Sequence, residues 1–242
     1  MVRDETETHV TADVAEKIAR VRERVAVAAA RAGRDPSSIR IVGVTKTVPA
    51  DAVEVLDQAY AAGLRVFGEN RVQDAARKQA SLFANALAAG AELHLIGYLQ
   101  TNKARDAVRL FSLIHSVDRP GLVDALQRRA AADGKHQDIL LQVNVAREPQ
   151  KHGCAPEEAE ALLRHAAAQP NLRVRGLMTI APLVDDPELT RPVFVALREL
   201  RDQLQEATGI ALPELSMGMT NDYEVAVEEG ATIVRVGRAI FG

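Results

Sequence analysis

The chain has 242 residues, of which 47% are hydrophobic and 26% are charged, a composition typical of a globular protein. Its net charge of -3 gives no reason to expect nucleic acid or a membrane surface as a partner. No apolar run approaches the roughly 20 residues that are needed to cross a bilayer. The single cysteine, Cys154, cannot form an internal disulfide, so we expect a cytoplasmic protein.

Apolar residues recur along the chain with helical or strand spacing, and glycine or proline separates most of the segments. Helices are predicted over residues 11–32, 50–62, 69–89, 101–110, 120–133, 156–168, 188–208 and 221–229. Strands are predicted over residues 39–44, 64–68, 92–97, 113–117, 139–145, 173–180, 213–217 and 232–237. Strands that alternate with helices in this way are expected to lie parallel, joined by crossover helices.

Eight strands with one extra helix in front favour a (β/α)8 TIM barrel that forms a single domain over residues 1–242. An open, doubly wound sheet is the alternative. No linker rich in proline, glycine or serine divides the chain, which supports one domain. The working site of such a barrel lies at the carboxyl ends of its strands, so polar residues there mark the candidate site.

The first strand is followed by Lys46, and only six of the 30 basic residues of the chain are lysines. Taken alone, a lysine at this position is more often a solvated rim charge than a reactive amine. A desolvated lysine, however, has a lowered pKa and can form an imine with an aldehyde. The other strand ends decide between these two interpretations.

Polar side chains also mark the carboxyl ends of nearly all the strands that follow the first. They are Asn70, His94, Ser116, Asn144, Thr179, Ser216 and Arg235. His94, Asn144 and Arg235 lie inside apolar strand patterns, so the general polarity of loops does not explain them. The pattern predicts a polar site at the mouth of the barrel.

The last two strands are followed by residues that suit a phosphate. Gly218 and Gly237 let the backbone approach an anion, and Ser216 and Thr220 supply hydroxyl groups. A helix predicted to begin near residue 221 would point its N–H groups toward the same place. Phosphate sites in this fold often use these two loops, so we expect an anion site here.

A reactive lysine and an anion site in one barrel mouth together suit a phosphorylated aldehyde, and pyridoxal 5'-phosphate (PLP) is the common one. Arg235, inside the last strand, is placed to meet the pyridine nitrogen. Because a permanent cation does not give up its proton, that nitrogen would stay unprotonated. An unprotonated ring is a poorer electron sink, which argues against demanding carbanion chemistry.

Eight short segments, in order, carry a resemblance to a known family. They are VTKT at 44–47, FGENRVQ at 67–73, HLIGYLQTNK at 94–103, SVD at 116–118, QVN at 142–144, GLM at 176–178, LSMGMT at 215–220 and VRVGRAIFG at 234–242. Together they resemble the pyridoxal phosphate homeostasis protein family (YggS/PROSC type). The resemblance implies a PLP barrel of fold type III, similar to the N-terminal domain of alanine racemase.

The resemblance also implies which residues bind the cofactor. It implies that Lys46 holds PLP as a Schiff base and that Arg235 faces the pyridine nitrogen. The other implied cofactor-binding residues are Ser216, Thr220, Gly237 and Arg238 at the phosphate, and Asn70, His94 and Met219 along the cofactor. Asn221 departs from the family pattern, which often has an aspartate there, and the lost carboxylate puts the local cap in doubt.

By resemblance, the protein serves intracellular PLP (vitamin B6) homeostasis as a monomer, without established turnover, and apo PLP-dependent enzymes are candidate partners. The alternative is a racemase or decarboxylase of fold type III. Such racemases carry a second β domain, for which no sequence remains after Gly242, and they need a base on each face of the substrate carbon. We therefore expect no catalytic residue and no metal, and the roles of Lys103 and Lys151 stay open.

Overall fold

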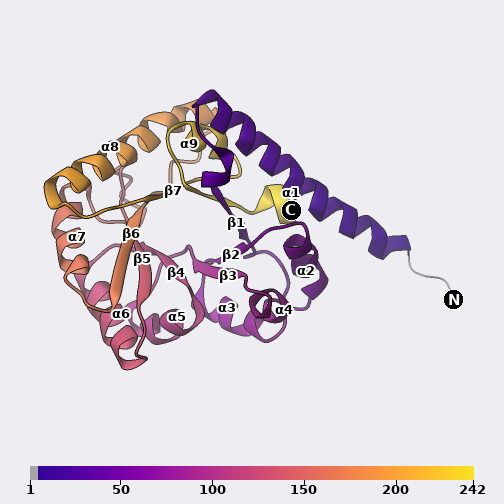
Figure 1. The fold of residues 1–242 in the computed structure, drawn as a ribbon, viewed down its shortest axis with the longest axis horizontal. Helices are drawn as coiled ribbons and strands as arrows, with labels where there is room; N and C mark the ends of the chain where they lie inside the picture. The colour runs from indigo at the N-terminus through magenta and orange to yellow at the C-terminus, as the bar shows by residue number, and fades with distance from the viewer. Residues whose placement is uncertain (1–4) are drawn as a thin grey trace.

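The computed structural model describes residues 5–242, with side chains from residue 14 onward, so residues 1–4 of the domain predicted over 1–242 lie outside it. Eight parallel strands close into a barrel in the order β1 to β8, and helices form a ring around it (Figure 1). The closed sheet confirms the predicted TIM barrel, and the open-sheet alternative is wrong.

All eight predicted strands are present. They are β1 (Arg40–Val44), β2 (Val66–Glu69), β3 (Glu92–Leu95), β4 (Leu113–Val117), β5 (Gln137–Gln142), β6 (Leu172–Met178), β7 (Glu214–Met219) and β8 (Ile233–Val236). The first and last strands pair in parallel, with Arg40 opposite Ile233, and this pairing closes the barrel. The carboxyl ends of all eight strands therefore meet at one rim.

The helices follow the strands in turn. They are α1 (Glu5–Arg31), α2 (Val53–Ala61), α3 (Val72–Gln79), α4 (Ala84–Ala88), α5 (Ala104–Leu110), α6 (Pro120–Ala132), α7 (Ala159–Ala167), α8 (Arg191–Thr208), α9 (Tyr223–Glu228) and α10 (Arg238–Phe241). Four 3-10 turns complete the set: η1 (Pro36–Ser38), η2 (Thr101–Lys103), η3 (Pro156–Glu158) and η4 (Pro187–Thr190). None of the helices in the described part of the chain is long and apolar enough to cross a membrane.

Several predicted bounds differ from the structure, including those of the third helix and the fifth strand. The helix predicted over 69–89 is two helices, because the chain turns after α3, where the carbonyl of Lys78 accepts hydrogen bonds from the N–H groups of Ser81 and Phe83. The fifth strand ends at Gln142, three residues before the prediction. Beyond it, Val143 forms an isolated bridge with Cys154, while its N–H still donates to the carbonyl of Met178 in β6.

The extra N-terminal helix, α1, lies across the place where the chain closes its ring (Figure 1). It packs against α2 at the start of the barrel and against α9 and α10 at its end. The amino group of Lys17 donates a hydrogen bond of 2.8 Å to the backbone oxygen of Gly242. The helix thus joins the first and last βα units from outside.

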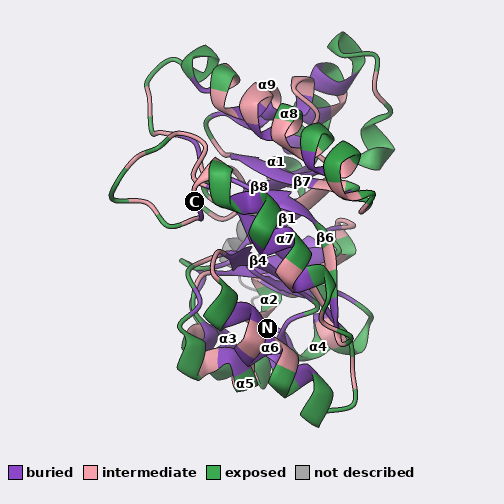
Figure 2. Ribbon diagram, turned by 90° about the vertical axis from the view of Figure 1, so that its left-hand side faces the viewer, coloured by how far each residue is buried: buried purple, intermediate pink, exposed green. Residues whose placement is uncertain are grey.

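The strands are largely buried, whereas the outer faces of the helices are exposed (Figure 2). One apolar cluster lies between the strands and the helices, and a smaller one fills the barrel. The smaller cluster comprises Val42, Val44, Val66, Ile96, Leu113, Leu140, Met178 and Ile233. Because side chains fill the barrel, a ligand can bind only at a rim, and the polar strand ends point to the carboxyl rim.

Candidate functional site

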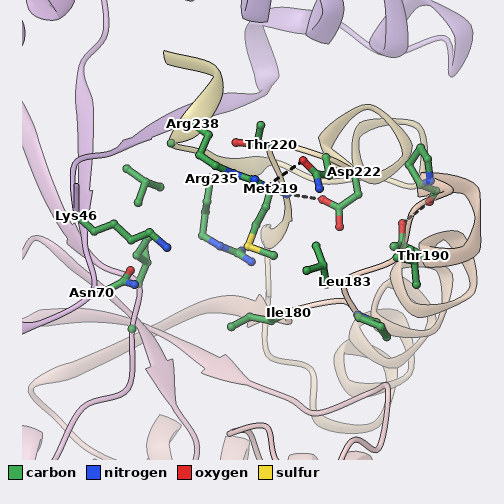
Figure 3. A pocket seen from close by; sticks show the side chains of 18 of the residues that line it. Lys46, Asn70, Ile180, Leu183, Thr190, Met219, Thr220, Asp222, Arg235 and Arg238 are labelled. Atoms are coloured by element: carbon green, nitrogen blue, oxygen red, sulfur yellow. Dashed lines mark hydrogen bonds between the residues drawn. The ribbon is translucent and has the colours of Figure 1, made fainter. Parts of the chain in front are cut away.

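A cavity of about 510 Å³ opens at the carboxyl ends of the strands. Seven of the nine predicted cofactor-binding residues line it (Figure 3). They are Lys46, Asn70, Met219, Thr220, Arg235, Gly237 and Arg238. These residues follow or end four different strands, β1, β2, β7 and β8, so the closure of the barrel alone brings them together.

Lys46 stands two residues after β1, and its side chain is exposed to the cavity. Its amino group points toward the same space as the guanidinium of Arg235 (Figure 3). Among the described residues, the amino group has no hydrogen-bond or ion-pair partner. An amine without a partner, in a cavity, is free to attack an aldehyde.

Arg235 is only 4% exposed, and its burial lowers its pKa to about 10, although the nearby carboxylate of Asp222 acts in the opposite direction. The guanidinium therefore stays charged at neutral pH. One terminal nitrogen donates to Ser216 Oγ at 2.7 Å, and the other donates to the carbonyl of Thr179 at 2.9 Å. A guanidinium has five N–H donors, so three remain for an acceptor in the cavity.

The other two predicted residues, Ser216 and His94, do not line the cavity. They lie behind Arg235, inside the barrel, and both are fully buried. His115 connects them, with Nδ1 at 2.9 Å from Ser216 Oγ and Nε2 at 3.0 Å from His94 Nδ1. The contact of Ser216 and His94 with a cofactor stays a prediction. In the structure Ser216 contacts Arg235 and His115, and His94 contacts His115 and Glu92.

The loop after β7 has a tight conformation that a glycine permits. Gly218 has a φ of 90°, and a Cβ atom there would lie 2.5 Å from the Cβ of Ala226. The N–H of Met219 donates to a carboxylate oxygen of Asp222 at 2.5 Å, and burial raises the pKa of this carboxyl. Asp222 directly precedes α9, but its carboxylate accepts from the end of β7 and caps no N–H group of that helix, so it does not replace the carboxylate that Asn221 lacks.

Arg238 joins the two loops of the expected anion site. Its guanidinium donates to the side-chain oxygen of Asn221 at 3.1 Å, across the cavity wall (Figure 3). Thr220 lines the same cavity. Within the described part of the chain, the backbone N–H groups of Thr220 and Asn221 donate no hydrogen bond to another backbone group. One hydroxyl and one cation thus line this corner of the cavity, and two N–H groups of the loop after β7 bond to no backbone carbonyl of the described chain.

At two glycines, neighbouring backbone segments around the cavity approach each other closely. A Cβ atom at Gly97 would lie 2.3 Å from the carbonyl oxygen of Asn70, so only glycine lets the end of β3 support the Asn70 loop. A Cβ atom at Gly237 would lie 3.3 Å from the carbonyl oxygen of Val44. Close backbone packing therefore sets the positions of Asn70 and of the loop after β8.

Sequence reasoning missed a buried ion pair beneath Lys46. The amino group of Lys78 lies 2.8 Å from Glu69 Oε1 and donates to the carbonyl of Thr45 at 2.8 Å. The hydroxyl of Thr45 donates to the same carboxylate oxygen at 2.7 Å. The pair therefore fixes the residue just before Lys46. A signal was present, because Lys78 falls on the face of α3 that buries Val72 and Ala75.

The apolar wall of the cavity was also missed. It comes from the segment between β6 and α8, for which the sequence predicted no part in the site. The residues are Ile180, Pro182, Leu183, Val184 and Pro187. Leu183 is 84% exposed, and such an exposed leucine at a cavity edge marks a surface that a ligand can cover. The cavity thus has one charged side and one apolar side.

Lys103 and Lys151 lie near the cavity without lining it. Lys103 lines a neighbouring cavity of about 620 Å³, which shares Asn70 and Gly97 with the first. The amino group of Lys151 donates to the carbonyl of Ala181 at 3.0 Å. Lys151 therefore holds the apolar loop in place from outside.

Cys154 does not take part in the site. It is buried, and burial raises the pKa of its thiol to about 12, so the thiol is protonated and unreactive at neutral pH. Among the residues with described side chains, no group of three or more His, Cys, Asp or Glu could hold a metal ion.

Removal of one partner should test the buried ion pair. We expect Lys78→Met to lower the free energy of unfolding by about 3–5 kcal/mol, because it leaves the carboxylate of Glu69 buried without a charge partner. The double variant Glu69→Gln with Lys78→Met should recover much of this loss. Arg77→Met, which removes an exposed partner of Asp74, should unfold at nearly the wild-type urea concentration. A single Lys78 variant as stable as wild type would contradict this role.

The two buried histidines should make the protein sensitive to acid. Burial is the main cause that lowers the pKa of His94 and His115 below the ordinary value of 6.5. As the pH falls below 6.5, the unfolded chain binds protons that the folded chain does not, so the free energy of unfolding falls. Below pH 6.5, His115→Gln should lose less stability than wild type, by up to about 1.4 kcal/mol per pH unit.

Urea unfolding of both proteins between pH 8 and pH 5 measures this difference. The carboxylates contribute equally to both chains, so they cancel in the comparison. Parallel curves for wild type and His115→Gln would show that His115 does not titrate differently in the two states.

Comparison with known proteins connects this site to a family. Residues 17–242 match the family of the alanine racemase N-terminal domain. The pyridoxal phosphate homeostasis protein of Aquifex aeolicus (strain VF5) is 47% identical over 227 residues, which cover 94% of this chain and 96% of that protein. The protein of the same name from Pseudomonas aeruginosa is 44% identical over 229 residues, 95% of either chain.

A solved structure agrees with both comparisons. PipY of Synechococcus elongatus PCC7942, solved with PLP bound, has a TM-score of 0.81 and 38% identity to this chain. The match covers 95% of this chain and 100% of PipY. The chain therefore belongs to the pyridoxal phosphate homeostasis protein family, as its sequence motifs suggested.

Proposed function

We propose that residues 1–242 form one barrel domain that binds PLP through Lys46 and serves PLP (vitamin B6) homeostasis without catalytic turnover. The observation that carries this proposal is the shared cavity of a free lysine amine and a buried arginine. The family of the chain and the PLP bound to PipY support it.

The cavity suits PLP in size and in chemistry. Its volume of about 510 Å³ lies within the range of about 300–1,000 Å³ that is common for small-molecule sites. PLP supplies an aldehyde and an anionic phosphate on a flat aromatic ring. Lys46 matches the aldehyde, Thr220 and Arg238 match the phosphate, and the apolar loop matches the ring.

Each residue has a part in this proposal. The amine of Lys46 forms the covalent link, and Asn70 and Met219 line the cofactor. Of the three remaining N–H donors of Arg235, one can donate to the ring nitrogen. With a pKa of about 10, this guanidinium keeps its own proton at neutral pH, so it donates a hydrogen bond without protonating the ring.

A racemase or decarboxylase is the alternative. A racemase needs an acid or base on each face of the reacting carbon. The titratable residues that line the cavity in the described chain are Lys46, Asp222, Arg235 and Arg238. Asp222 is already bonded to the N–H of Met219, and the two arginines are cations. This set favours a binding protein over a racemase.

The remaining parts of the proposal concern the oligomeric state, the location in the cell and the partners. We expect a monomer that acts in the cytoplasm and exchanges PLP with apo PLP-dependent enzymes. The buried, protonated thiol of Cys154 is consistent with a reducing compartment.

Loading with PLP tests the covalent link. We expect the purified protein to be yellow, and borohydride reduction followed by peptide mapping to place the label on Lys46. Lys46→Ala should take up no covalent label, whereas Lys103→Ala, at the neighbouring cavity, should load as wild type does. A colourless protein that takes up no PLP, or a label on another lysine, would refute the proposal.

Turnover separates the binding protein from the enzyme. We expect the loaded protein to racemise or decarboxylate no amino acid above the rate of free PLP, because Asp222, the one carboxyl among the described residues that line the cavity, is already bonded to the N–H of Met219. A panel of amino acids, followed by chiral chromatography, measures this rate. Sustained turnover that disappears in Lys46→Ala would establish the enzyme instead.

A further inference from the structure

Five side chains form a continuous chain of hydrogen bonds through the barrel. It begins at Arg235 in the cavity and passes through Ser216, His115 and His94, over distances of 2.7, 2.9 and 3.0 Å. It ends at Glu92, where His94 Nε2 lies 3.1 Å from a carboxylate oxygen. Glu92 opens β3, so the chain runs from the carboxyl rim of the barrel to its amino rim.

The hydrogen bonds of this chain all point in one direction. A guanidinium has no acceptor, so Arg235 donates to Ser216 Oγ. At the other end, a carboxylate only accepts, so His94 donates from Nε2 to Glu92. A neutral His94 then accepts at Nδ1 from His115 Nε2. A neutral His115 in turn accepts at Nδ1 from the hydroxyl of Ser216.

Protonation of His115 would break this order. Its Nδ1–H would point at Ser216 Oγ, which already accepts from Arg235, and the hydroxyl proton would lose its acceptor. A second cation would also lie beside the buried guanidinium, without a carboxylate in contact with either. Both effects are costly where no water compensates them. The neutral form with its proton on Nε2 is therefore the one that satisfies every group.

We propose that His115 is a positioning residue, which fixes the guanidinium of Arg235 in the cavity by orienting the hydroxyl of Ser216. The hydroxyl proton is held by His115, so the oxygen lone pairs face Arg235. The carbonyl of Thr179 holds the other terminal nitrogen at 2.9 Å, and the two contacts together fix the plane of the guanidinium. The consequence for PLP binding rests on the proposed function, but the orientation of Arg235 does not.

Three variants and one control distinguish an effect of the hydrogen-bond chain from an effect of side-chain packing alone. His115→Phe keeps the ring but removes both nitrogens. His115→Gln restores an acceptor for Ser216 and a donor for His94. Ser216→Ala breaks the chain at its first link with the loss of a single oxygen. His165→Phe is the control, because His165 pairs with Asp124 on the half-exposed surface of α7.

Nitrogen-15 NMR of the protein without PLP reports directly on the protonation of the two histidines and on the rotation of the Arg235 guanidinium. At neutral pH we expect wild-type His94 and His115 to be neutral, each with its proton on Nε2. The terminal nitrogens of Arg235 should give separate signals, because two hydrogen bonds hinder their rotation. These signals should merge in His115→Phe and Ser216→Ala, and should stay separate in His115→Gln and in His165→Phe.

The affinity for PLP gives a second measurement. We expect His115→Phe and Ser216→Ala to bind PLP about tenfold more weakly than wild type, the size of effect expected when a hydrogen bond to a charged group is disturbed. His115→Gln and His165→Phe should stay within about twofold.

Three outcomes would overturn the inference. They are a wild-type His115 that is charged or carries its proton on Nδ1, separate Arg235 signals in Ser216→Ala, and a His115→Gln variant that behaves like Ser216→Ala. If His115→Phe does not fold, Ser216→Ala and the wild-type histidine signals still decide. A wild-type protein that binds no PLP would refute the proposed function alone, because the NMR measurements need no cofactor.

Discussion

A permanent positive charge buried inside a barrel is the constraint on which the site depends. Arg235 is 4% exposed, and the transfer of a guanidinium from water to such a place is costly unless every donor toward the protein is satisfied. Ser216, Thr179 and the charge of Asp222 meet this demand from three different loops or strands. Of these three residues, Asp222 lines the cavity, whereas Ser216 and Thr179 hold the cation from behind it.

A second buried charge acts at the other side of the cavity. Lys78 of the Glu69–Lys78 pair donates to the carbonyl of Thr45. The pair thus fixes the residue between the end of β1 and Lys46. Among the described residues, Arg235 therefore has only neutral hydrogen-bond partners, with the charge of Asp222 nearby, whereas Lys78 is paired directly with a carboxylate. Together the two buried cations position the amine of Lys46 and the guanidinium of Arg235. They thus set the distance that a ligand bound to both groups would span.

The sequence predicted the barrel and most of the cavity because both follow from local patterns. Alternating βα units imply parallel strands, and Lys46 and Arg235 stand out against apolar runs. The sequence did not predict that Ser216 lies inside the barrel, away from the cavity. Ser216 and Thr220 would share a face in a regular strand, but the register with β8 shifts between Ser216 and Met219, where Gly218 adopts its positive φ. This irregularity leaves Thr220 at the cavity and Ser216 inside the barrel, and no pattern of hydrophobicity reports it.

The same arrangement limits the chemistry that the cavity supports. Arg235 keeps its proton at neutral pH, and the histidines behind it are neutral and donate toward Glu92, away from the cavity. No group in the described chain that lies behind the guanidinium therefore delivers a proton toward the cavity. A ring nitrogen that only accepts a hydrogen bond withdraws electrons less strongly than a protonated one. Under the proposed function, a site built in this way favours holding an aldehyde over stabilising a carbanion.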